Sequence, residues 1–139
     1  MPLPMRRYAH ILVVLLVCAG SSAVVAQSAT ETAIRDVIAR QLEAMNRGDG
    51  VAAFAFASPA IQSIFGDAAN FMRMVERGYP QIYRSRRHRF LQLDRSGAEL
   101  IQRVLIESDS GSVVARYEMV KIEGTWRING CTIEPPEAA

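Results

Sequence analysis

Apolar residues recur at helical spacing in the stretch that follows Ser28. Ser28 and Glu31 form the Ser-x-x-Glu pattern of a capping box, in which two side chains satisfy free amides at the start of a helix. Gly48 is suited to the left-handed residue that closes a helix. The pattern therefore predicts an amphipathic helix between Ser28 and Gly48. Its apolar face carries Ile34, Val37, Ile38, Leu42 and Met45.

Three capping residues predict that shorter helices follow. Asp49 precedes the apolar residues 51–56, and Ser58-Pro59 supplies an N-cap and a first helical residue. Asp67 precedes a third apolar stripe, which Gly78 ends. These segments are too apolar to be exposed, so we expect the helices to pack on another layer.

From about His88 the apolar period changes to two, which is typical of strands. Ser110-Gly111 and Glu123-Gly124 stand where tight hairpin turns are needed, and Gly supplies the positive φ. Short loops make neighbouring strands antiparallel. The prediction is an α+β domain with N-terminal helices packed on a curved four-stranded antiparallel sheet. The strands are expected at residues 90–93, 98–107, 113–121 and 125–133.

The two predicted turns also set the strand register. A two-residue loop at Ser110-Gly111 places Arg103 opposite Glu118, an opposite-charge pair that favours this pairing. The other pairs that the turns predict are Glu107 with Val114, Leu105 with Arg116, Met119 with Ile128, Tyr117 with Gly130 and Cys131 with Arg116.

The register sorts the strand residues onto two faces. The face covered by helices is expected to carry Leu100, Gln102, Val104, Ile106, Ala115, Tyr117, Met119, Trp126 and Ile128. The opposite face carries Ile101, Leu105, Val114 and Val120 among Arg103, Arg116, Glu118 and Arg127. This second set is too apolar for a fully solvated face, so we expect it to form the interface of a homodimer.

Residues 1–26 have the pattern of a secretory signal peptide. Arg6-Arg7 forms a basic start, residues 11–19 are an apolar run, and Val24 and Ala26 are small residues before the expected cut. The run is shorter than the roughly 20 residues of a spanning helix, so an uncleaved anchor is the less favoured alternative. We expect export to the periplasm or the exterior, with no stable membrane insertion after cleavage. The residues do not separate the general from the twin-arginine route.

Cleavage would leave one α+β domain at residues 27–134 and a loose tail at residues 135–139. This mature chain has 14 basic and 14 acidic residues, a balance that argues against a nucleic-acid partner. Cys131 is then the single cysteine, which excludes an intrachain disulfide. His88 and Cys131 belong to no ligand-spaced cluster, so we expect neither a metal nor another cofactor.

Several motifs resemble a known family. They are Gln41-Leu42, the Ala-Phe-Ala-Phe-Ala-Ser-Pro block at residues 53–59 with Ile61, Phe65-Gly66, Phe71, Met74-Val75, Gly78-Tyr79 and the Trp-Arg-Ile-Asn-Gly-Cys block at residues 126–131. On these motifs the mature chain resembles a bacterial exported family known as domain of unknown function 4864.

More broadly, helices before a curved sheet, with Gly-x-Trp-Arg-Ile at residues 124–128, resemble the cystatin-like, nuclear transport factor 2-like cone fold. SnoaL-like proteins and ketosteroid isomerase share that fold. The resemblance implies a fold and no catalytic residue, because the family has no established activity to carry over.

Two groups of residues are candidates for binding. Gln102, a polar amide in an apolar row, and Tyr117 lie on the predicted inner face, with Trp126 and Tyr79 as further pocket candidates. The structural alternative for Gln102 is a hydrogen bond to a core backbone group, which we favour. The second group consists of Arg84, Arg86, Arg87 and Arg89. These side chains could together hold a phosphate or a carboxylate. The favoured alternative is that they are solvated at the start of a strand, where acidic residues balance their charge.

The predicted inner face is apolar and carries no Asp or Glu among its strand residues. We therefore favour a non-enzymatic exported domain that binds a small apolar or amphipathic molecule, or a protein partner. Two alternatives stay open. One is an isomerase- or dehydratase-like enzyme that uses Tyr117 and a polar residue from the helices; the other is a structural module acting through the outer sheet face.

Overall fold

The computed structural model describes residues 19–135. By their contacts the residues form two units, Met1–Thr30 and Glu31–Ala139. The described part of the first unit is the N-terminal portion of helix α1 (Ala19–Asn46). Residues 1–18, which hold most of the predicted signal peptide, and residues 136–139 of the predicted tail lie outside the described residues. The fold and the site described below belong to the second unit.

Four short helices follow α1, and the side-chain caps of the first three confirm the predicted starts. Asp49 accepts a hydrogen bond from the amide of Ala52 at 3.0 Å. The Ser58 side chain accepts a hydrogen bond from the amide of Ile61 at 3.3 Å, and the Asp67 side chain accepts one from the amide of Asn70. The helices are α2 (Gly50–Ala55), α3 (Pro59–Phe65), α4 (Ala68–Gly78) and α5 (Pro80–Tyr83).

The capping box predicted at Ser28 is wrong for this chain. Helix α1 is already under way at Ala19, so Ser28 lies inside it, and Glu31 pairs with Arg35 one turn later. No proline or glycine stands between residues 21 and 28 to interrupt the helix. The sequence pattern also missed α5, a single turn that Pro80 opens at the first helical position.

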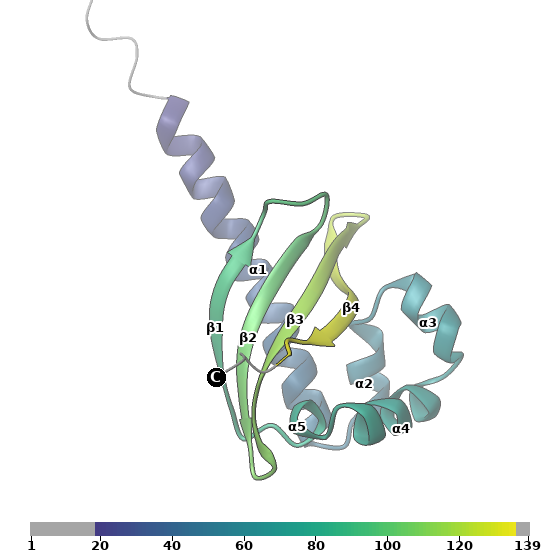
Figure 1. Ribbon diagram of the computed structural model, residues 1–139. Coiled ribbons are helices and arrows are strands. Elements are labelled where there is room, and N and C mark those ends of the chain that lie inside the picture. The colour runs from purple at the N-terminus through teal and green to yellow at the C-terminus, as the bar shows by residue number, and fades with distance from the viewer. Residues whose placement is uncertain (1–18, 136–139) are drawn as a thin grey trace, which may run out of the picture. The chain divides into compact units, whose positions relative to one another are not determined.

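The four predicted strands are confirmed and form one sheet in the order β1-β2-β3-β4, with every neighbouring pair antiparallel. Figure 1 shows the strands curving together, with helices on one side of the sheet. The chain is therefore an α+β domain, as predicted. The strands are β1 (Arg87–Asp94), β2 (Leu100–Ser108), β3 (Gly111–Ile122) and β4 (Thr125–Ile133).

The two faces of the sheet also match the prediction. Seven of the nine residues predicted for the helix-covered face are buried, and Leu100 and Trp126 pack at the edge of the same core. The buried strand residues are Gln102, Val104, Ile106, Ala115, Tyr117, Met119 and Ile128. Helix α1 contributes the buried Ile34, Ile38, Leu42 and Met45, which is the apolar face its spacing predicted, apart from the partly buried Val37.

The predicted register between β2 and β3 is wrong by two residues. Arg103 lies opposite Arg116, and Glu118 lies opposite Ile101. The loop is Asp109-Ser110, and the positive φ falls after it, on Gly111, the first residue of β3. Moving the loop back by one residue shifts the pairing by two, which keeps every side chain on its predicted face. The corrected pairs include Glu107 with Ser112 and Leu105 with Val114.

The hairpin between β3 and β4 is correct at its turn and wrong beyond a bulge. Glu123 and Gly124 both adopt positive φ, as a tight hairpin turn requires, and Met119 faces Ile128 as predicted. Asn129 is then an extra residue, because Glu118 pairs with Gly130. Past this bulge Tyr117 faces Cys131 instead of Gly130, and Arg116 faces Thr132 instead of Cys131.

Candidate ligand pocket

A cavity of about 230 Å³ lies between the helices and the inner face of the sheet. Every helix of the second unit except α2 contributes to its wall, together with β3 and β4. Its lining residues are Gln41, Met45, Ala57, Ile61, Phe65, Phe71, Met74, Val75, Tyr79, Ile82, Tyr117, Ile128, Gly130 and Cys131.

The wall of the cavity is apolar and uncharged. Aliphatic and aromatic side chains dominate it, and none of the described lining residues is Asp, Glu, His, Lys or Arg. Phe71 packs at once against Phe54 and Phe65, with ring centroids 5.4 and 5.8 Å apart. The lining residues Ile61, Phe65 and Met74, which come from α3 and α4, are partly exposed.

Tyr117 and Tyr79, two of the predicted pocket residues, meet in this wall. The hydroxyl of Tyr79 already has a hydrogen-bond partner, because it donates to the carbonyl oxygen of Cys131 at 3.2 Å. Tyr117 is 1% exposed, and its hydroxyl has no hydrogen-bond partner of acceptable geometry in the described part of the chain. Burial raises the pKa of Tyr117 well above its ordinary value, and the neighbouring Cys131 raises it further, so the group stays a neutral phenol.

Cys131 owes its place in the cavity to the bulge at Asn129. Without the extra residue, Cys131 would fall on the outer face opposite Arg116; with it, Cys131 lies beside Tyr117. Asn129 fixes the bulge, since it accepts a hydrogen bond from Ser58 at 2.8 Å and donates to Glu118 at 3.2 Å. Burial raises the pKa of the Cys131 thiol to about 12, so it is a weak nucleophile at neutral pH.

Gln41 is a polar lining residue that the sequence indicates only as part of the family resemblance. It is 3% exposed, and its amide nitrogen donates to the carbonyl of Ala53 at 3.2 Å, which ties α1 to α2. Its signal was present, because Gln41 stands seven residues after Ile34 and so lies on the buried stripe of the helix. The apolar side chains of α4 and α5 could not be assigned to a cavity from spacing alone.

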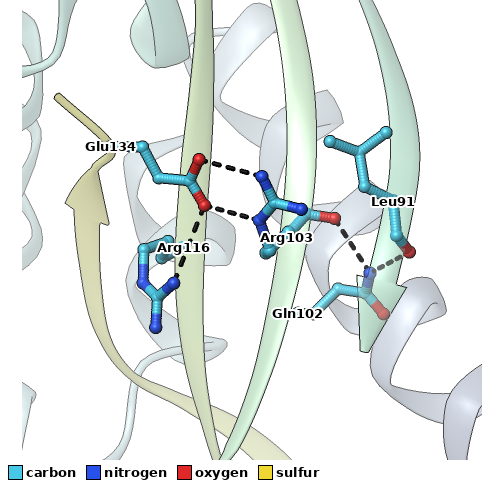
Figure 2. A network of polar contacts seen from close by, with 5 residues as sticks. All are labelled: Leu91, Gln102, Arg103, Arg116 and Glu134. Atoms are coloured by element: carbon cyan, nitrogen blue, oxygen red, sulfur yellow. Dashed lines mark hydrogen bonds and ion pairs between the residues drawn. The ribbon is translucent and has the colours of Figure 1, made fainter. Parts of the chain in front are cut away.

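The structure places Gln102 and Trp126 away from the cavity lining. The amide nitrogen of Gln102 donates to the carbonyls of Leu91 at 3.0 Å and Arg103 at 2.9 Å, so it braces the irregular pairing of β1 (Figure 2). This is the backbone role that the sequence favoured for a buried amide. Trp126 lies near the end of the sheet, where the Lys121 ammonium is 5.8 Å from its ring.

The four arginines of the predicted anion site lie on the surface, apart from the cavity. Arg84 pairs with Glu76, Arg86 with Asp109, and Arg87 with Glu107. The shallow depressions that Arg86 helps to line also contain acidic residues. Arg89 is exposed and makes no ion pair with the residues described. The structure therefore does not gather the four guanidinium groups around one anion.

Within residues 19–135, no helix combines the length and apolar content that crossing a bilayer requires, and no three His, Cys, Asp or Glu side chains gather as metal ligands. The fold and the cavity define the class: a small α+β domain with an apolar pocket under its helices. Residues 27–139 match the model of a family described as Domain of unknown function (DUF4864), and the chain belongs to that family. The search of curated proteins gave no match.

Proposed function

We propose that the domain binds a small, mainly apolar molecule in the cavity under its helices. The observation that carries this proposal is the cavity itself, about 230 Å³ with an apolar wall. Protein interiors are close-packed, and voids larger than a water molecule are few. Apolar side chains that line a cavity lack packing partners on that side, so an apolar ligand that contacts them would be favoured.

The volume limits the size of the ligand. An apolar cavity of about 150 Å³ is known to hold benzene, and pockets for drug-sized molecules begin at about 300 Å³. A cavity of about 230 Å³ suits one ring with a short substituent, or a short branched chain.

The chemistry of the wall supports binding more than acid–base catalysis. Proton abstraction needs a base within reach of the substrate, and the described lining offers no carboxylate and no imidazole. The remaining titratable groups are Tyr117, Cys131 and Tyr79, and burial disfavours ionisation of the first two.

A cavity-filling variant tests the proposal. Val75 is 4% exposed and lines the cavity, so Val75→Phe should occupy part of its volume. We expect the wild-type domain to bind the hydrocarbon α-methylstyrene in ligand-observed NMR, and Val75→Phe to lose this binding while staying folded by circular dichroism. Val51→Phe, the same change at a position that is 76% exposed, is the control and should bind normally. A wild-type domain that binds no small hydrocarbon would contradict the proposal.

We also propose that the domain acts after export. Residues 1–26 carry the signal-peptide pattern, and the buried core begins at Ile34, so cleavage after Ala26 would remove none of it. Mass spectrometry of the protein from the cell envelope should find Gln27 as the first residue. A chain that retains Met1 would contradict this proposal.

Two further parts of the proposal concern relatives and partners. The helices and curved sheet support a place within the nuclear transport factor 2-like cone fold of bacterial exported proteins.

On the outer sheet face, Leu105 lies directly opposite Val114, and both are partly exposed. Because an apolar pair at the centre of a sheet favours a cover, we propose that a second copy packs there to form a homodimer.

A further inference from the structure

Among the polar groups of the cavity wall, the Tyr117 hydroxyl differs from its neighbours. The Gln41 amide nitrogen donates to Ala53, and the Tyr79 hydroxyl donates to the Cys131 carbonyl. The Tyr117 hydroxyl is buried and has no such partner among the described residues. Buried polar groups in folded proteins are nearly always hydrogen-bonded, so this exception calls for an explanation.

The surroundings of Tyr117 show that its hydroxyl lacks a good hydrogen-bond acceptor. Its polar neighbour across the strand pair is Cys131, whose sulfur is a weak acceptor. Because burial and Cys131 raise the pKa of Tyr117, the hydroxyl keeps its proton and can donate it to an acceptor. An oxygen atom is a better acceptor than sulfur for this O–H group.

The geometry points to a ligand class: an uncharged molecule of about one ring whose oxygen, in a carbonyl or ether, accepts a hydrogen bond from the Tyr117 hydroxyl. This inference rests on the proposed function and makes Tyr117 the residue that sets specificity. The apolar wall would hold the hydrocarbon part of the molecule, and the hydroxyl would fix which end enters.

The wall also explains why the ligand should be uncharged. No described lining side chain carries a charge of either sign. An ionised ligand would lose its hydration without gaining a counter-charge, which is far more costly than burying a carbonyl that receives one hydrogen bond. A carboxylate or an ammonium compound of the same shape should therefore be excluded.

Three probes of nearly the same shape separate these features. Acetophenone carries a carbonyl acceptor, α-methylstyrene replaces that oxygen with a CH₂ group, and benzoate is the charged counterpart. Dissociation constants are measured by NMR titration for the wild type, for Tyr117→Phe and for Tyr79→Phe. Tyr79→Phe is the matched control, because it removes a hydroxyl of the same wall that already has a protein partner.

We expect the wild type to bind acetophenone about 3- to 10-fold more tightly than α-methylstyrene, and benzoate much more weakly than either. Tyr117→Phe should abolish the preference, so that it binds the ketone and the hydrocarbon about equally, whereas Tyr79→Phe should keep the preference.

Three results would overturn the inference. One is equal binding of ketone and hydrocarbon by the wild type, as would follow if a cavity water satisfied Tyr117. The others are a ketone preference that survives in Tyr117→Phe, and benzoate binding as tight as that of acetophenone. In each case hydrocarbon binding would still support the proposed function. Failure of all three probes to bind would reject the proposed function and this inference together.

Discussion

Glu134 and Arg103 form a bidentate ion pair on the outer face of the sheet. The Nε atom of Arg103 donates to Oε1 of Glu134 at 2.5 Å, and its Nη2 atom donates to Oε2 at 2.9 Å. Arg116 faces Arg103 across the two strands, and its Nη1 atom lies 3.7 Å from the same carboxylate (Figure 2). The carboxylate thus offsets the repulsion of two like charges and holds the segment after β4 against the sheet.

This ion pair predicts a pH-dependent contribution to stability. The hydrogen bond from Arg103 is the largest cause of a lowered pKa at Glu134. A carboxyl whose pKa is lower in the folded state stabilises the fold above its unfolded pKa, about 4.3 for Glu, and that contribution is lost as the pH falls through the folded pKa. Because the Glu134 side chain is 23% exposed, solvent screens part of the effect.

We therefore expect Glu134→Gln to lower the free energy of unfolding by about 1 kcal/mol at pH 7. The difference from the wild type should shrink as the pH is lowered below about 4. Urea unfolding at several pH values measures both effects. Glu123→Gln removes an exposed carboxylate in the β3–β4 turn and is the control, with little change expected. A loss in Glu134→Gln that does not change with pH would show that ionisation of the carboxylate is not its source.

The corrected register changes which charge reversal should be tolerated. Arg103→Glu places an acid beside Glu134, so it should destabilise the fold, and adding Glu134→Arg should restore part of the loss because opposite charges face each other again. Adding Glu118→Arg instead should restore less, since Glu118 lies opposite Ile101 and not Arg103. Thermal unfolding of the two double variants decides. Better rescue by Glu118→Arg would support the register predicted from the sequence.

The error in the predicted register shows that alternation of apolar and polar residues along a strand decides the face of each side chain but not the pairing of the strands. Alternation assigned residues such as Val104 and Leu105 to their faces correctly, because one face is buried and the other is not. A shift of two residues leaves every face unchanged, so alternation could not detect it. The favourable pair of Arg103 and Glu118 was misleading, because the partner of Arg103 is Glu134, which lies beyond the strands.

The pocket could be predicted only in part, for a related reason. Tyr117 was placed on the inner face by alternation alone. The predicted register placed Cys131 opposite Arg116, on the outer face, because it did not include the bulge, which adds one residue at Asn129. The polar contacts that hold this bulge involve Ser58, 71 positions away. Likewise, the sequence predicted an apolar stripe between Asp67 and Gly78 but not the cavity beside the buried Phe71 and Val75, because packing against the sheet decides where space remains.

The two tyrosines of the cavity should respond in opposite ways to loss of their hydroxyl groups. Tyr79→Phe removes a hydrogen bond and leaves the carbonyl of Cys131 without it, so we expect a loss of about 1 kcal/mol in the free energy of unfolding. Tyr117→Phe removes a buried hydroxyl that has no partner among the described residues, so stability should stay the same or rise. Urea unfolding in the absence of ligand makes the comparison. A large loss in Tyr117→Phe would mean that its hydroxyl is satisfied in the free protein.

The proposed homodimer predicts that one charge on the outer face blocks association. Leu105 lies opposite Val114 on β3 and Arg89 on β1, at the centre of the outer face. Leu105→Glu would bring a carboxylate into a two-fold interface, where it would lose hydration, and because the interface repeats the same patch, each dimer would contain the charge twice.

Sedimentation velocity should therefore find a dimer for the wild type and a folded monomer for Leu105→Glu, with unchanged far-UV circular dichroism. Ile64→Glu, which adds the same charge at a position on α3 that is 71% exposed, should remain dimeric. A wild type that stays monomeric at high micromolar concentration would exclude the homodimer. A dimer that Leu105→Glu leaves intact would place the interface elsewhere, and the apolar pair of Leu105 and Val114 would then need a different cover.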